Sequence, residues 1–217
     1  MINEFVKKIA TYTQFENVEN QYSDLFRYNS ITKNNLIRYL ENMLLSKPKF
    51  ALVGEAPGYN GCRWSGVPFT AEKNLTFEYR KNQLFGLKNG FQVRHANKPQ
   101  SEASATIVWE YLYNVNVYPL IWNAFPFHPH KPNNTQSNRK PSFAELEFGK
   151  GILEELISIY KISKIIAIGN IAQKSLLTIG INCYKVRHPA NGGKKEFIKG
   201  MDEEMGIHPT NKGLIPS

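Results

Sequence analysis

Residues 49–70 read KFALVGEAPGYNGCRWSGVPFT, an apolar segment that runs directly into a long glycine-rich loop. Residues 49–53 are too apolar to have a solvated face, which is typical of a buried strand in a parallel sheet. The loop that follows carries Glu55, Arg63 and Phe69 among its glycines and prolines. The stretch therefore predicts a strand that ends in a polar, sharply turning loop.

The first turn of this loop is defined by Gly54 and Gly58, which let the backbone change direction, and by Pro57, which stiffens it. Amide groups exposed in such a turn can hold an anion or polarise a carbonyl group or a water molecule. The loop has neither the GxxxxGK[ST] pattern of a phosphate loop nor the GxGxxG pattern of a dinucleotide site. A purely structural turn explains the same glycines, so the loop alone does not assign a function.

Outward from this stretch, the chain alternates between short apolar strands and amphipathic helices. Further strands are predicted at 117–122, 162–168 and 184–186, and helices at 2–15, 32–46, 71–80, 101–115, 142–160 and 170–179. Ser142 and Glu145 form a capping-box pattern at the start of the long helix. Strands that alternate with helices predict a three-layer α/β/α sandwich with a central four-stranded, mostly parallel sheet.

No internal repeat, low-complexity tract or linker divides the chain, so we expect residues 1–217 to form a single domain. Residues 1–30 are predicted to be a helical N-terminal extension. Residues 86–100 are polar and basic and are expected on the surface. Residues 206–217 have no periodicity and are expected to form a loosely held tail.

Composition narrows the class of protein. The 217 residues carry 27 basic and 18 acidic side chains, a net charge of +9, which favours a polyanionic partner such as nucleic acid. A basic surface that only maintains solubility is the alternative. Cys62 and Cys183 are too few for a disulfide framework or a four-cysteine metal site. We find no secretory h-region and no apolar run long enough to span a membrane, and therefore expect a cytoplasmic protein.

Three of the four predicted strands run into polar loops, GEAPGYNGCRWSGVPFT (54–70), NAFPFHPH (123–130) and RHPANGG (187–193). In parallel α/β sheets, ligands bind outside the carboxyl ends of the strands. The sequence therefore predicts one site built from three loops.

The second and third loops carry the residues with the clearest chemistry. The amide of Asn123 presents a donor and an acceptor side by side, which suits the edge of a pyrimidine base, although, taken alone, a turn-forming asparagine that caps its own backbone is the more common case. His188 is placed to donate a hydrogen bond to charge that develops on a leaving group, although a structural histidine also fits. The basic residues from 185 to 199, interrupted by small residues, suit a phosphate backbone or a solvated loop.

Taken in order, GEAPG, PFT, WNAFPFHP and RHPANGG resemble the motifs of the uracil-DNA glycosylase superfamily, in a bacterial branch, over residues 48–198. The resemblance implies a DNA repair enzyme that hydrolyses the N-glycosidic bond of uracil, or a related deaminated base, after flipping it out of the duplex. It implies DNA containing such a base as the partner, and neither a metal nor another cofactor. We expect a monomer with no membrane association.

The resemblance also implies roles for individual residues. Phe69 would stack on the base, Asn123 would read its edge, and His188 would stabilise negative charge on the departing uracil. The turn would position the base and the water molecule through Gly54, Ala56, Pro57 and Gly58. Contacts to DNA would come from Arg63, Arg187, Pro189, Ala190, Asn191, Gly192, Lys194 and Lys195.

The sequence departs from the pattern of the superfamily at Ala56, where many active members carry aspartate or asparagine that positions water. Glu55, one residue earlier, is the carboxylate that could take this role and is included with Asn123 and His188 as a candidate catalytic residue. The iron–sulfur branch shares GEAPG but needs four cysteines, and this chain has two. The alternatives are a binding module of the same fold without turnover and a hydrolase acting on free nucleosides.

Overall fold

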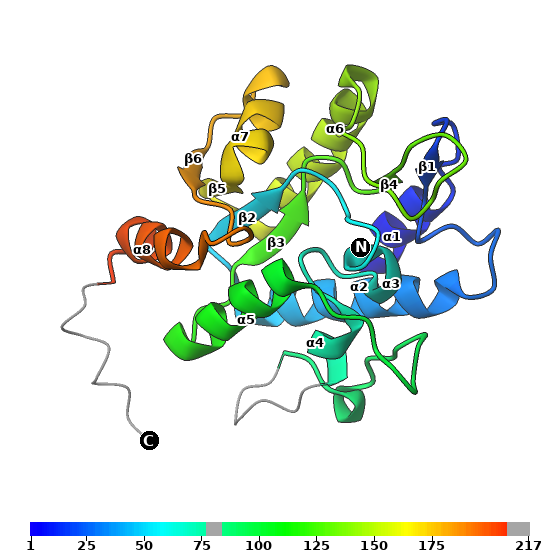
Figure 1. Cartoon of the computed structure of the whole chain (residues 1–217), viewed down its shortest axis with the longest axis horizontal. Helices are drawn as coiled ribbons and strands as arrows, with labels where there is room; N and C mark the ends of the chain where they lie inside the picture. Colours follow the sequence, from blue (N-terminus) through cyan, green and yellow to red (C-terminus); the bar gives the residue numbers. More distant parts are fainter. Residues whose placement is uncertain (77–83, 208–217) are drawn as a thin grey trace.

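The structure is a computed structural model that describes residues 1–76 and 84–207 (Figure 1). The helices are α1 (Ile2–Ala10), α2 (Asn29–Ser46), α3 (Cys62–Ser65), α4 (Glu72–Thr76), α5 (Ala103–Val115), α6 (Phe143–Tyr160), α7 (Gly169–Thr178) and α8 (Lys194–Met205), with a 3-10 turn at Leu87–Asn89. The strands are β1 (Val18–Glu19), β2 (Phe50–Gly54), β3 (Leu120–Asn123), β4 (His128–Pro129), β5 (Lys164–Ile168) and β6 (Tyr184–Val186).

The central sheet has the order β3-β2-β5-β6, and every neighbouring pair is parallel. The chain passes from β2 to β3 on one side and then returns across β2 to β5 on the other. This reversal places the carboxyl ends of β2 and β5 at the switch point of the sheet, where α/β folds bind ligands. The predicted α/β class and the four-stranded parallel sheet are confirmed.

The connections place helices on both faces of the sheet. Right-handed crossovers in opposite directions carry their helices to opposite faces. Figure 1 accordingly shows α6 and α7 on one side of the sheet and α2 and α5 on the other. Because both faces are covered, Ala51, Leu52 and Val53 in β2 and Leu120, Ile121 and Trp122 in β3 are completely buried.

The free edge of β3 is closed by α2. The backbone N–H of Ile121 donates to the hydroxyl oxygen of Tyr39 at 2.7 Å, which satisfies a group that the next strand of a sheet would otherwise pair. On the other side of β3, the N–H of Ala124 donates to the carbonyl of Gly54 at 2.8 Å. The sheet therefore ends at β3, and its carboxyl edge is held rigidly.

Several predicted boundaries differ from those in the structure for identifiable reasons. The strand predicted at 117–122 begins at Leu120, because the N–H of Val117 donates to the carbonyl of Leu112 and caps α5. The helix predicted at 2–15 ends at Ala10. Of the helix predicted at 71–80, Glu72–Thr76 is present and the remainder lies largely outside the described residues.

Both ends of the chain contain elements that pack against the rest of the structure. Helix α1 packs against α2, with Phe5 buried in edge-to-face contact with Trp122. Strand β1 pairs with β4 in a small antiparallel ribbon that the sequence pattern did not predict. Helix α8, also not predicted, buries Phe197 and Met201. Most of the tail expected at 206–217 lies outside the described residues.

The capping box at the start of α6 gives a prediction for stability. The N–H of Glu145 donates to the Ser142 hydroxyl at 3.3 Å, and the N–H of Ser142 donates to the Glu145 carboxylate at 2.7 Å. We expect Ser142→Ala to lower the free energy of unfolding by about 1 kcal/mol, the usual value of such a cap. Urea denaturation measures this change, with the exposed Ser158→Ala in the same helix as the control. Equal stability of the two variants would contradict the assignment.

Candidate active site

A cavity of about 500 Å³ lies at the carboxyl edge of the sheet. It is lined by residues of all three predicted loops, namely Glu55, Ala56, Pro57, Gly58, Phe69, Asn123, Arg187, His188, Ala190 and Asn191. The structure therefore brings together side chains that are up to 136 positions apart in the chain, from Glu55 to Asn191.

Asn123 stands at the end of β3, directly opposite Gly54 at the end of β2. The pairing continues beyond it, because the N–H of Phe125 donates to the carbonyl of Glu55 at 2.9 Å. The Asn123 side chain is only 2% exposed, and its Oδ1 has no hydrogen-bond partner among the described residues. A buried carbonyl oxygen without a partner is costly, so this amide is prepared for a ligand that donates to it.

Gly54 allows Phe69 and Asn123 to meet. A Cβ atom on Gly54 would lie 2.1 Å from Cε2 of Phe69 and 2.6 Å from Oδ1 of Asn123. The aromatic ring and the amide thus approach each other across a residue that has no side chain. The ring centroid of Phe69 is also 6.0 Å from that of His188.

Phe69 has a backbone φ of 48°, a left-handed conformation that bulky residues rarely adopt. Such a conformation costs about 1–3 kcal/mol and persists where the surrounding structure enforces it. The indole N–H of Trp109 donates to the carbonyl of Phe69 at 3.0 Å and to the hydroxyl of Thr70 at 2.9 Å. The Ser65 hydroxyl donates to the carbonyl of Thr70 at 2.6 Å. This network holds the phenylalanine ring at the cavity.

His188 follows β6 and is held by its own loop. The N–H of Ala190 donates to Nδ1 of His188 at 3.2 Å, so a neutral ring carries its proton on Nε2. Burial, and then the charge of Arg187, lower the pKa of His188. The lowered pKa favours the neutral imidazole, whose proton is then on Nε2.

Glu55 is half-buried at the cavity wall, one residue beyond β2. Burial raises the pKa of its carboxyl group, and the charge of Lys140 partly opposes this effect. A carboxylate with a raised pKa is a better proton acceptor than an exposed one. The neighbouring Ala56 also lines the cavity but has no polar side-chain atom.

Glu102 is a second carboxyl group in the cavity and was missed from the sequence. It precedes α5 and lies against Gly61, where an added Cβ would be 1.9 Å from Oε2 of Glu102. Burial raises the pKa of Glu102. Glu102 comes before a helix, whereas the signal in the sequence for the other site residues was a polar loop that follows a strand.

The β5–α7 junction also lines the cavity, through Ile168, Gly169, Asn170, Ile171 and Ala172. Gly169 has a φ of +90°, and a Cβ there would lie 2.9 Å from Cβ of His188. The end of the predicted strand at Gly169 could have indicated that this junction lines the cavity. Of the residues that follow it in the lining, however, only Asn170 has a polar side chain. Their contribution is a close apolar wall beside His188.

Arg63 lies away from the cavity. Its Nε and Nη2 donate to the Glu19 carboxylate at 3.0 and 2.5 Å, and Nη1 donates to the carbonyl of Thr135 at 2.8 Å. The side chain is buried, so its donors hold the β1 region together and are not presented to a phosphate.

Of the other residues predicted to contact DNA, some line the cavity, some do not, and Pro189 is buried. Arg187 and Asn191 are exposed and line the cavity. Pro189, Gly192, Lys194 and Lys195 are outside its lining. Lys194 forms an exposed ion pair with Glu110 at 3.0 Å.

Cys62 lines the cavity but is not a reactive thiol. It is buried, with the Tyr22 hydroxyl at 3.7 Å, and burial raises the pKa of its thiol to about 12. Within residues 1–76 and 84–207, no cluster of histidine, cysteine, aspartate or glutamate is suited to a metal ion. No described helix is long and apolar enough to cross a membrane.

Comparisons with known proteins identify a family and a similar fold. The profile of the "Uracil DNA glycosylase superfamily" matches residues 43–206. The fold is similar to the crystal structure of wild-type SMUG2 from Pedobacter heparinus, with a TM-score of 0.60 and 13% sequence identity. That match covers 94% of this chain and 97% of the other. No match was found among curated proteins.

Proposed function

Because the chain belongs to the uracil DNA glycosylase superfamily, we propose that it hydrolyses the N-glycosidic bond of uracil, or a related deaminated base, in DNA. The observation that carries the proposal is the meeting of Phe69, Asn123 and His188 in one cavity at the switch point of the sheet. These residues supply an aromatic face, an amide and a neutral imidazole, which match the face, edge and carbonyl oxygen of a pyrimidine.

Recognition of the base would depend on Phe69 and Asn123. The Phe69 ring stacks on the flipped base, which cannot be reached within the duplex. Oδ1 of Asn123 accepts the hydrogen bond of uracil N3–H, and its amide N–H donates to O4. Cytosine has an acceptor at N3 and a donor at C4, so the same amide orientation rejects it. The unpartnered Oδ1 supports this assignment.

Bond cleavage would depend on His188 and Glu55. As the bond between C1′ and N1 breaks, electrons move to the base, and Nε2–H of His188 donates to the oxygen that becomes negative. A water molecule adds to C1′, and its proton passes to the Glu55 carboxylate. The products are an abasic site and the free base. The half-buried position of Glu55 and its raised pKa support its role as the proton acceptor.

Binding to the DNA backbone would use the segment after β6. Residues 190–193 form a tight turn, with Asn191 and Gly192 at positive φ and the N–H of Gly193 donating to the carbonyl of Ala190 at 3.1 Å. Exposed Arg187 and Lys195 flank this turn. Because each neutralised phosphate releases counterions, affinity for DNA should fall steeply as the salt concentration rises.

The decisive experiment is an excision assay. An oligonucleotide with a single uracil is incubated with the protein and treated with alkali, and strand cleavage at that position is the expected result. Matched substrates with cytosine, thymine, hypoxanthine or xanthine at the same position define base preference, in both single- and double-stranded form. Absence of cleavage with every substrate would refute the enzymatic proposal.

Ala56 favours a second candidate function, a module that binds a damaged base without hydrolysis. If the protein has this second function, it should bind DNA containing uracil or an abasic site tightly and should not excise the base. Binding should then be unaffected by His188→Ala. Gel-shift measurements on the same oligonucleotides, combined with the excision assay, separate the two functions.

The contact at Gly54 gives a prediction specific to the proposed function. A methyl group in Gly54→Ala would overlap the Phe69 ring and the Asn123 amide, so one of them must move. We expect kcat/KM on uracil-containing DNA to fall by about 10²-fold, the effect of displacing groups that position the substrate. The exposed Gly151→Ala, which has open space at its Cβ position, is the matched control. Unchanged activity in Gly54→Ala would contradict the assigned positions of Phe69 and Asn123.

A further inference from the structure

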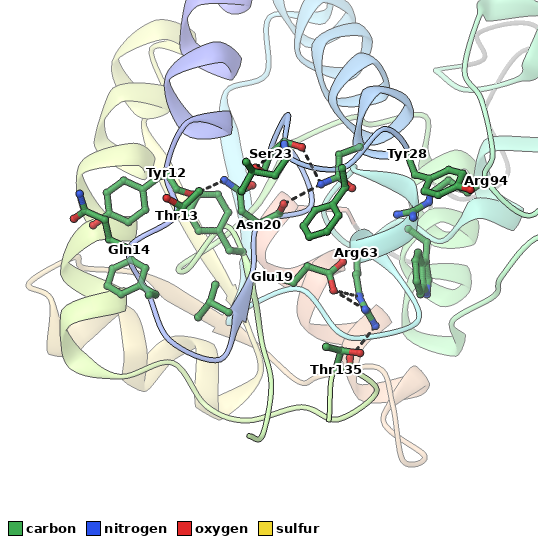
Figure 2. Close-up of a pocket in the computed structure, with 17 residues that line it drawn as sticks. Tyr12, Thr13, Gln14, Glu19, Asn20, Ser23, Tyr28, Arg63, Arg94 and Thr135 are labelled. Atoms are coloured by element: carbon green, nitrogen blue, oxygen red, sulfur yellow. Dashed lines mark hydrogen bonds and ion pairs between the residues drawn. The ribbon is translucent and has the colours of Figure 1, made fainter. Parts of the chain in front are cut away.

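A second cavity, of about 470 Å³, lies between the segment that follows α1, strand β1, the segment 20–29 and helix α3. It shares no lining residue with the candidate active site. Figure 2 shows it as a groove that extends from Tyr12 at one end to Tyr28 and Arg94 at the other, with Glu19 and Arg63 between them. We refer to it as the Tyr12–Arg94 groove.

Eight of the 17 residues that line the groove are aromatic or aliphatic. Tyr12, Phe15, Val18 and Phe127 contribute to it. Its rim contains three large apolar side chains within four residues, Leu25, Phe26 and Tyr28, which are 73%, 60% and 65% exposed. Exposed apolar side chains gathered around a concave surface are typical of a site that binds another molecule.

The walls of the groove are held in place by hydrogen bonds. The side chain of Asn20 donates to the carbonyls of Ile9 and Tyr12 at 2.7 and 2.9 Å. The side chain of Asn29 donates to the carbonyls of Asn20 and Ser23 at 3.2 and 3.0 Å. The segment bearing the exposed apolar residues is therefore preorganised, which lowers the entropic cost of binding.

Arg94, at one end of the groove, indicates the charge of the group that would bind there. Its guanidinium lies over the rings of Trp64 and Tyr28, at 4.7 and 5.2 Å from their centroids. Nη1 is buried and has no hydrogen-bond partner among the described residues. The backbone N–H of Arg94 donates to the buried Glu72 carboxylate at 2.6 Å, and this bond holds the backbone from which the side chain extends. A buried cationic donor without a partner is costly, so this position favours an anionic group from outside.

The charges of the groove limit what can bind. Of its two arginines, Arg63 is already neutralised by Glu19, so Arg94 is the cation with an open donor among the lining residues. Nη1 is its unpartnered donor, and one such donor suits one carboxylate oxygen. A nucleic acid strand would require a series of cations along its backbone, whereas the lining has two arginines, one of them paired with Glu19.

We propose that the Tyr12–Arg94 groove binds a peptide segment of a partner protein that carries an aromatic or aliphatic side chain next to an acidic residue. The apolar side chain occupies the groove beside Phe26 and Tyr28, and the carboxylate forms an ion pair with Arg94, whose guanidinium lies over the Tyr28 ring. This binding is independent of base excision, and its failure would leave the proposed catalytic function untouched.

Fluorescence anisotropy with designed peptides tests the proposal on the full chain. The probe is a fluorescein-labelled glycine–serine peptide with a phenylalanine between two aspartates. Matched peptides replace the phenylalanine with serine or both aspartates with lysine, and a labelled oligothymidine tests for single-stranded DNA. We expect the acidic, phenylalanine-containing peptide to bind and each replacement to weaken binding by about tenfold or more.

Substitutions in the protein test whether the acidic peptide binds in the Tyr12–Arg94 groove. Arg94→Gln and Phe26→Ser should each weaken binding of the acidic peptide by about tenfold, while uracil excision and melting temperature stay unchanged in Phe26→Ser, whose side chain is 60% exposed. Arg38→Gln, an arginine outside the groove, is the control and should bind as the parent does. No binding of the peptide up to about 1 mM, or equal binding by all variants, would overturn the proposal. So would oligothymidine binding that depends on Arg94 when peptide binding does not.

Discussion

Replacement of His188 by alanine is expected to lower kcat on uracil-containing DNA by about 10²–10³-fold, the effect of removing one donor from a developing negative charge. The N–H of Ala190 donates to Nδ1 of the ring, which leaves Nε2–H for the donation to the departing base that we propose. Because this donation strengthens as the bond breaks, kcat should fall while KM changes little. Single-turnover excision of uracil from an oligonucleotide measures the effect.

His130→Ala is the matched control, because His130 lies outside the cavity and its Nδ1 contacts the carbonyl of Lys131. It should excise uracil at the parent rate. His188→Gln retains an N–H donor and should recover part of the activity lost in His188→Ala. If His188→Ala kept at least half of the parent kcat, the role assigned to His188 would be wrong.

Replacement of Glu55 by glutamine is expected to lower kcat by about 10²–10⁴-fold, the range for loss of a general base. The change keeps the shape of the side chain and removes its proton-accepting oxygen. Binding of DNA containing uracil should remain, since the Phe69 ring and the Asn123 amide, which we propose to hold the base, are unchanged. Glu102→Gln provides the comparison, because Glu102 is the other carboxyl group that lines the cavity. Loss of activity in Glu102→Gln alone would transfer the role from Glu55 to Glu102.

The pH profile provides a further check on Glu55. Burial raises the pKa of this carboxyl group, so kcat should decline on acidification at a pH above the ordinary value of 4.5, as the carboxylate takes up a proton. The charge of Lys140 lowers the same pKa, so Lys140→Gln should move the acidic limb to higher pH. An acidic limb that is identical in the parent and in Lys140→Gln would contradict this assignment.

The local patterns in the sequence predicted the scaffold well because each depends on neighbouring residues. The capping box of Ser142 and Glu145 is a short-range feature, and it is present in the structure. The apolar run that becomes β2 needs only burial on both faces to be recognised as a strand. Ribbon β1–β4 was not predicted, because Val18 pairs with Pro129, far along the chain, and two-residue strands have no periodicity.

For the candidate site, the sequence by itself determined which strand ends carry polar loops, and therefore that Glu55, Asn123 and His188 would lie at one edge of the sheet. Parallel strands align their carboxyl ends, so this follows from local pattern and topology. Only the tertiary structure decided which side chains touch. Arg63 is paired with Glu19, Glu102 enters the cavity from outside the strand-end loops, and Phe69 meets Asn123 across Gly54. These contacts depend on side-chain packing between distant segments, where removing or adding a single Cβ decides whether two groups can approach.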